Sequence, residues 1–105
     1  SPMFRGILST IYLDLKNKVN INQVNSCLKK FYKKDIFIKI LPINSFLSTN
    51  DVINTNYCNV SVCKSKDKNK LIILSAIDNL IKGGAGQAVQ NLNYYFDYNI
   101  KKGLI

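Results

Sequence analysis

The chain has 105 residues, which is enough for one domain with a modest hydrophobic core but too few for a two-domain enzyme. Hydrophobic residues make up 47% of it, and no apolar run approaches the roughly 20 residues that cross a bilayer. The net charge is +9, but the lysines are scattered beside asparagines, whereas a nucleic-acid-binding surface gathers its basic residues on one face. The composition therefore favours a soluble cytoplasmic domain with neither a membrane nor a nucleic acid as partner.

The first half of the chain predicts a strand, a helix and a second strand. Gly6–Leu15 is rich in Ile, Leu, Thr and Tyr, which is typical of a strand with one buried face. Asn20, with Gln23 three residues later, predicts a capped helix start. Apolar residues then follow at helical spacing, namely Ile21, Val24, Cys27, Leu28 and Phe31. Asp35–Leu41 is β-branched and aromatic and is followed by Pro42, so it predicts a second strand.

The second half predicts a long loop, a hairpin and a closing helix. Ile43–Tyr57 is crowded with Asn, Ser and Thr, which favour turns, and Ser48–Asp51 suits one helical turn. Cys58–Lys64 and Lys70–Ile77 are strand-like runs joined by a short turn, as in a hairpin. A last helix begins at Asp78 or its neighbour. This order indicates an α+β domain, a mixed β-sheet with helices on one face.

One segment carries a chemical signature: DNLIKGGAGQAVQNLN, residues 78–93. Each glycine inside a helix costs roughly 1 kcal/mol relative to Ala, so a cluster of them needs a reason. The cluster consists of Gly83, Gly84 and Gly86. In one interpretation the helix start faces an anionic ligand, with Gln87 and Gln90 as hydrogen-bonding groups; in the other it packs tightly on the sheet. The spacing leaves both open, and it matches neither the dinucleotide fingerprint nor the P-loop.

Groups that perform catalysis are scarce in this sequence. There is no His, and the three cysteines, Cys27, Cys58 and Cys63, form no CxxC pair, so no metal site is predicted. An odd number of cysteines argues against a secreted disulfide framework and favours buried, reduced thiols. Nothing assembles a nucleophile, a base and an orienting group. We therefore expect no catalytic residue in this chain.

Two segments taken together, PMFRGILSTIYLDL near the start and AIDNLIKGGAGQAVQNLN near the end, resemble the N-acetyl-γ-glutamyl-phosphate reductase family of arginine biosynthesis. TNYCNVSV in the middle agrees with it. The resemblance implies a fold similar to the C-terminal domain of glyceraldehyde-3-phosphate dehydrogenase. Residues 1–105 would then be the substrate and dimerisation domain of a longer two-domain reductase. Its own N-terminal Rossmann domain and a second copy of the chain would be its partners.

The resemblance also implies a chemistry. In that family a cysteine thiolate attacks N-acetyl-glutamyl phosphate, phosphate leaves, and hydride from NADPH reduces the thioester to the semialdehyde. This cysteine and an acid/base histidine would lie upstream, so the 105-residue chain alone is expected to be inactive. Arg5 matches the arginine of the family's PMxRG segment, which implies a role in holding the substrate's phosphate or carboxylate.

In the same family the glycine-rich helix start lies against the nicotinamide end of NADP, which the N-terminal domain mainly binds. The matching residues are Asn79, Lys82, Gly83, Gly84, Ala85, Gly86, Gln87 and Gln90. Two alternatives stay open. An aspartate-semialdehyde dehydrogenase-like domain has a similar helix start, although the PMFRG segment argues against it. A basic module that binds nucleic acid through its lysines is the other.

Overall fold

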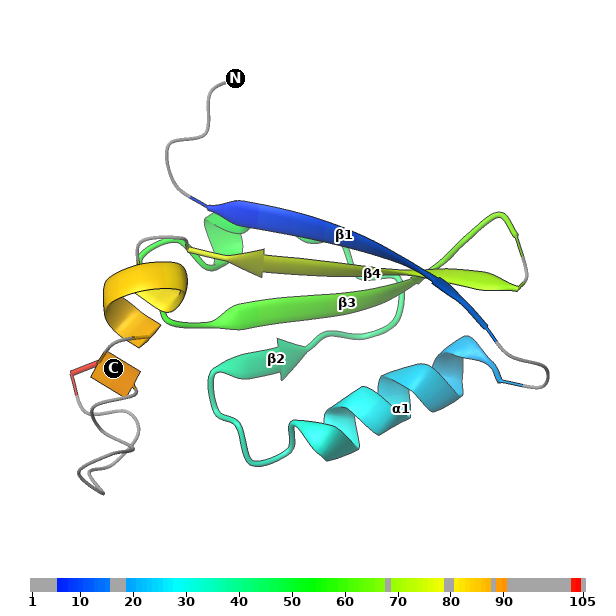
Figure 1. The fold of residues 1–105 in the computed structure, drawn as a ribbon, viewed down its shortest axis with the longest axis horizontal. Helices are drawn as coiled ribbons and strands as arrows, with labels where there is room; N and C mark the ends of the chain where they lie inside the picture. Colours follow the sequence, from blue (N-terminus) through cyan, green and yellow to red (C-terminus); the bar gives the residue numbers. More distant parts are fainter. Residues whose placement is uncertain are drawn as a thin grey trace.

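The computed structural model describes residues 6–15, 19–67, 69–78, 81–87, 89–90 and 103–104. Figure 1 shows a twisted sheet with one long helix beside it. In chain order the elements are β1 (Ile7–Asp14), α1 (Ile21–Phe31), β2 (Ile38–Ile40), a 3₁₀ turn η1 (Thr49–Asp51), β3 (Cys58–Lys64), β4 (Lys70–Ile77) and a π-helical turn η2 (Ile81–Ala85). Within the described residues, no helix is both long and apolar enough to cross a membrane.

The four strands form one mixed sheet in the order β1-β4-β3-β2. β4 pairs antiparallel with β1 on one side and β3 on the other, while β2 and β3 are parallel. The predicted β3–β4 hairpin is confirmed, with Cys58 opposite Ile77 at one end and Lys64 opposite Leu71 at the other. The predicted α+β class with a mixed sheet is confirmed as well.

The two faces of the sheet are covered by different segments. α1 contacts β2 and β3 and connects β1 to β2 (Figure 1). On the opposite face runs the long loop between β2 and β3, which carries η1. From this loop, Leu47 and Val52 pack against Ala76 of β4, and the Ser61 hydroxyl of β3 donates a 2.8 Å hydrogen bond to the Ser45 carbonyl. A parallel β2–β3 pair needs such a crossover, because its two strands run in the same direction.

The predicted capping box of α1 is confirmed, but the predicted apolar stripe is only partly covered: Ile21, Val24 and Leu28 are half-buried. The Gln23 amide donates to Asn20 Oδ1 at 2.9 Å, and the Asn20 amide donates to Gln23 Oε1 at 2.8 Å. Asn25 is buried, whereas Cys27 is exposed and Phe31 is 78% exposed. The prediction that Cys27 and Phe31 belong to the buried stripe is therefore wrong. The helix is rotated toward Asn25, because the position of β2 and β3 decides which of its sides is covered.

β1 forms where the sequence predicts it, but the expected buried face is absent. All eight of its residues are exposed, including the large apolar ones Ile7, Leu8, Ile11, Tyr12 and Leu13. β1 is an edge strand, and α1 lies under β2 and β3 at the other side of the sheet. β1 is paired with β4 along one edge, but within the described part of the chain the side chains on both of its faces are exposed.

The remaining boundaries follow from local hydrogen bonds. β2 is shorter than predicted because Asp35 Oδ1 accepts a 3.1 Å bond from the Phe37 amide and holds a turn before Ile38. The predicted helical turn in the long loop is confirmed as η1, whose cap Ser48 accepts from the Asn50 amide at 3.2 Å.

Candidate functional site

The two sequence motifs meet at one end of the sheet. β1 begins at Ile7, directly after the PMFRG segment, and β4 ends at Ile77, directly before the glycine-rich segment. Ile7 and Ile77 are register partners, so the ends of both motifs lie side by side. Gly6 has a φ of +96°, and a Cβ there would lie 2.7 Å from Thr49 Cβ. Only glycine suits this position, where the motif passes close over η1.

The starts of β2 and β3 complete this end. Cys58 of β3 is the partner of Ile77 on one side and of Ile38 on the other, so the residues that precede β2 and β3 also gather here. They include Phe37 and Asn56, which are 0% and 1% exposed. Phe37 packs against the ring of Tyr57 at a centroid distance of 5.7 Å.

The glycine-rich segment folds as a tight turn here. The amides of Ile81 and Gly83 both donate to the Asp78 carbonyl at 3.2 Å. Gly84 leaves helical geometry, with φ −147° and ψ −113°, and helical residues resume at Gly86. The predicted single closing helix is therefore wrong over its first turns, where the chain takes a π-helical turn and then a kink. Its later residues, 91–102, lie outside the described part.

The three glycines serve different purposes: one is required by tight packing, and two are available to a ligand. Gly86 is buried, and a Cβ there would lie 2.4 Å from both Asn56 Oδ1 and Ile81 Cγ2. It is glycine because of tight packing. Gly83 and Gly84 are exposed, and their backbone is open to an approaching group. Packing therefore explains the third glycine, and ligand approach stays available to the first two.

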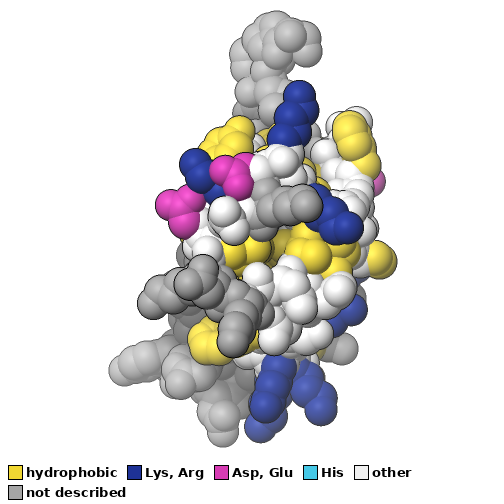
Figure 2. Space-filling view, turned by 90° about the vertical axis from the view of Figure 1, so that its right-hand side faces the viewer, with side chains coloured by type: hydrophobic (Ala, Val, Ile, Leu, Met, Phe, Trp, Pro, Cys, Tyr) yellow, Lys and Arg dark blue, Asp and Glu magenta, His cyan; other side chains and the backbone are white. Residues whose placement is uncertain are grey.

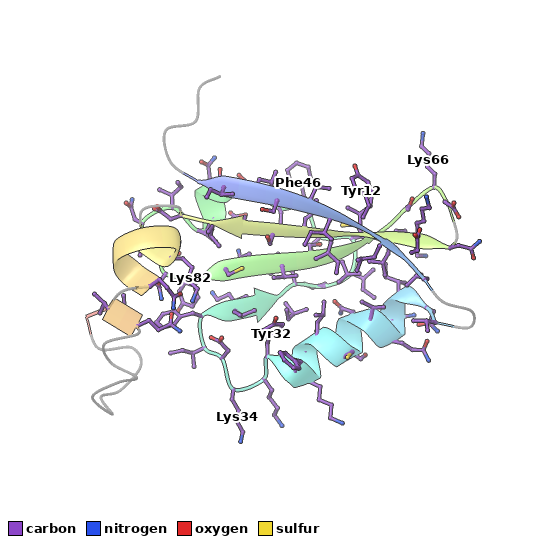
Figure 3. The ribbon with its side chains drawn as sticks, in the orientation of Figure 1. Tyr12, Tyr32, Lys34, Phe46, Lys66 and Lys82 are labelled. Carbon is purple, nitrogen blue, oxygen red and sulfur yellow. The ribbon has the colours of Figure 1, made fainter. Side chains whose placement is uncertain are left out.

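Three polar side chains link the turn to the sheet. Asn56 Nδ2 donates to Gln90 Oε1 at 2.9 Å, and Lys82 Nζ donates to the same oxygen at 2.8 Å. Lys82 reaches from the turn toward the starts of β2 and β3 (Figure 3), where its Nζ lies 5.7 Å from the centre of the Phe37 ring. The Gln90 carboxamide oxygen thus connects the turn, through Lys82, with Asn56, which lies two residues before β3.

Buried Asp78 braces the turn from behind. It is 0% exposed, and its Oδ2 accepts a 2.8 Å hydrogen bond from the Asn54 amide. Asn54 has a positive φ of 64°, and this charge-assisted bond stabilises that conformation. Asp78 directly precedes the turn, and its hydrogen bond to Asn54 connects the glycine-rich segment to the long loop.

The cysteines do not form a reactive centre. All three are free, but Cys27 is exposed, so the expectation that all are buried is wrong for this residue. Burial raises the pKa of the Cys58 thiol above its ordinary value, outweighing nearby Lys82, which acts to lower it. Cys58 is therefore protonated at neutral pH and a poor nucleophile there. Within the described residues, no group of three or more Cys, Asp or Glu is placed to hold a metal ion.

The structure brings together every predicted site residue that it describes in full. Lys82, Gly83, Gly84, Gly86, Gln87 and Gln90 all belong to the turn or to the helical residues that follow it. For Ala85 only the backbone is described, and Arg5 and Asn79 lie outside the described residues. Sequence reasoning missed Asn56, because it stands in an Asn-rich loop where every asparagine resembles a turn former.

Two hollows in the described part of the surface lie away from the glycine-rich turn. One of about 370 Å³ is bordered by Leu15, Val19, Lys64 and Leu71, and another of about 420 Å³ lies along α1 beside Val24. Figure 2 views the molecule from the end away from the glycine-rich turn, where apolar side chains show between charged ones. Of the predicted site residues that the structure describes, none borders either of these two hollows.

Comparison with known proteins shows the family to which the chain belongs. Residues 1–79 match the model of the family described as semialdehyde dehydrogenase, dimerisation domain, and the chain belongs to this family. Membership in a dehydrogenase family implies a nicotinamide cofactor for the whole enzyme.

Particular relatives are more specific. The chain is 44% identical over 103 residues to the N-acetyl-gamma-glutamyl-phosphate reductase of Clostridium kluyveri, covering 98% of this chain and 30% of that protein. It is 44% identical over 104 residues to the reductase of a Thermoanaerobacter species, with 99% and 30% covered. The reductase of Staphylococcus aureus is 38% identical over 103 residues, with 98% and 30% covered. The chain thus spans about 30% of the length of these relatives and corresponds to their C-terminal part.

Proposed function

We propose that the enzyme containing this chain is an N-acetyl-γ-glutamyl-phosphate reductase of arginine biosynthesis. It reduces N-acetyl-glutamyl phosphate with NADPH to N-acetyl-glutamate semialdehyde and releases phosphate and NADP. The 44% identity to reductases of this name, over nearly the whole chain, carries the proposal. The meeting of the two resembling motifs at Ile7 and Ile77 supports it.

In this proposal residues 1–105 are the C-terminal substrate and dimerisation domain of a two-domain cytoplasmic enzyme, whose N-terminal Rossmann domain binds most of the cofactor. The catalytic cysteine and histidine lie outside residues 1–105. Two observations support this division of labour: the sequence contains no His, and burial raises the pKa of the Cys58 thiol. The chain's own task is to position the reactants.

The described residues fit the nicotinamide end of NADPH, which would supply the hydride when bound. Gly83 and Gly84 present exposed backbone without side chains, so a flat ring can approach closely. Lys82, which precedes Gly83 in the chain, adds a positive charge whose Nζ lies 2.8 Å from Gln90 Oε1, and a cation at this turn suits an anionic cofactor. The turn is held rigidly from behind through Gln90 and Asp78, which keeps this surface in one shape.

For substrate binding we propose Arg5. It directly precedes Gly6, which lies at the same end of the sheet as the glycine-rich turn. A guanidinium binds a phosphate or carboxylate in a bidentate manner, which a lysine cannot reproduce. Asn79, directly after Asp78, completes the proposed cofactor-contacting set by resemblance.

The dimerisation-domain family supports a homo-oligomer, and β1 is the surface that we propose for it. Ile11 and Tyr12 are 47% and 71% exposed and point to opposite faces of the same edge strand. Phe46, which is 92% exposed, and Tyr12 both project beyond β1 in Figure 3. Apolar side chains exposed on an edge strand in this way are typical of a protein interface.

The test is an assay of NADPH oxidation by the full-length enzyme. We expect turnover with N-acetyl-glutamyl phosphate and little with aspartyl phosphate. Turnover with aspartyl phosphate alone would favour the aspartate-semialdehyde dehydrogenase reading, and absence of turnover with either would reject the proposal. Retention on DNA that falls steeply with salt would instead support the basic nucleic-acid-binding module.

A further inference from the structure

Asn56 is a buried polar residue around which the glycine-rich turn is built. It is 1% exposed and precedes β3, and its Nδ2 donates a 2.9 Å hydrogen bond to Gln90 Oε1. Its Oδ1 is buried and has no hydrogen-bond partner among the described residues. A Cβ at Gly86 would lie 2.4 Å from this oxygen, so the turn closes directly over the carboxamide.

Such an arrangement is unfavourable for stability alone, because a buried carbonyl oxygen without a partner loses its hydrogen bonds to water. The hydrogen bond to Gln90 is the distinctive contribution of Asn56. Gln90 Oε1 also accepts from Lys82 Nζ, so Asn56 fixes the acceptor that holds the side chain of Lys82, the residue before the exposed glycines.

We propose that Asn56 is a positioning residue for the nicotinamide end of NADP. It acts through Gln90 and Lys82 and shapes the backbone of Gly83 and Gly84, since its own burial prevents contact with the cofactor. The proposal rests on the proposed function, because the cofactor contact of the turn belongs to it. It adds to the proposed cofactor site a residue, Asn56, that comes from the long loop and lies outside both sequence motifs.

The experiment compares full-length enzymes carrying Asn56→Ala, Gln90→Ala and both substitutions. Asn25→Ala is the matched control, because Asn25 is also buried with an unpartnered Oδ1 but lies in α1, on the far side from the turn in Figure 1. For each enzyme we would measure the dissociation constant of NADPH, KM for both reactants, kcat and Tm.

We expect Asn56→Ala and Gln90→Ala each to weaken NADPH binding by about twofold to tenfold, the range of one lost hydrogen bond. The KM of the acyl phosphate should stay within about twofold, and the double variant should be no worse than the weaker-binding single variant, because both act through one contact. Asn25→Ala should lower Tm without weakening NADPH binding.

Two results would overturn the inference. Unchanged NADPH binding in Asn56→Ala, with only a lower Tm, would make Asn56 a purely structural residue. Additive effects in the double variant would show that it does not act through Gln90. Failure of the proposed function is a separate result: wild-type enzyme that binds NADPH in an Asn56-dependent way but does not turn over N-acetyl-glutamyl phosphate would reject the substrate while keeping the positioning role.

Discussion

Ile7 and Ile77 stand opposite each other at the end of the β1–β4 ladder, although 70 positions separate them in the sequence. One follows the PMFRG segment and the other precedes the glycine-rich turn. Strand pairing therefore brings the ends of the two motifs to the same end of the sheet.

Gly86→Ala should destabilise the enzyme. The new methyl group would lie 2.4 Å from Asn56 Oδ1 and 2.6 Å from the Ile81 carbonyl oxygen, and the latter belongs to the backbone and yields little. Overpacking of this kind costs about 1–3 kcal/mol of unfolding free energy. Urea denaturation measures the change, with Ser26→Ala on the exposed side of α1 as control. Equal stability of Gly86→Ala and wild type would contradict the close packing of the turn.

Asn20→Ala should weaken the start of α1. The substitution removes the side-chain acceptor of the Gln23 amide, and loss of such a cap costs about 0.5–2 kcal/mol. Asn22→Ala is the matched control, because it makes the same exchange at an exposed position inside the helix, where Ala is the better helix former. Thermal unfolding should show a lower Tm for Asn20→Ala alone. Similar changes in both variants would rule out the capping role.

Cys58 should make stability fall at alkaline pH. Burial raises the pKa of the Cys58 thiol in the folded state above the ordinary value of 9.0. The contribution of the protonated thiol to the free energy of unfolding is therefore fully present below that value and is lost as the pH rises through the folded-state pKa. Cys58→Ala should remove this component, while Cys63→Ala, on the same strand, serves as control. Tm between neutral pH and about pH 10.5 measures it. If Tm falls equally at alkaline pH in Cys58→Ala, the loss of stability comes from the titration of another group.

Charge on β1 should disrupt the oligomer. Tyr12→Lys places an ammonium group in the exposed apolar surface of the edge strand, and burying it against a second copy would be strongly unfavourable. Analytical ultracentrifugation should show a shift toward monomer. Ser26→Lys adds the same charge on the exposed side of α1 and should leave the mass unchanged. An intact oligomer in Tyr12→Lys would place the interface elsewhere.

Local patterns in the sequence were sufficient for most elements. Alternation predicted Cys58–Lys64 with the bounds that β3 has, and the Asn20–Gln23 pair predicted the start of α1. Both signals depend on neighbours within a few residues. The rotation of α1 depends on its packing against β2 and the more distant β3, which no pattern within the helix reveals. For this reason the sequence predicts burial of Cys27 and Phe31 wrongly.

The sequence by itself determined the strand and helix types, the cap of α1 and the resemblance of two short segments to one reductase family. Only the tertiary structure decided that these segments share one end of the sheet, that Gly86 serves packing while Gly83 and Gly84 stay open, and that Asn56 belongs to the site. The reason is physical. Propensity and capping act between near neighbours, whereas register, burial and hydrogen bonds such as that between Asn56 and Gln90 exist only once distant segments pack together.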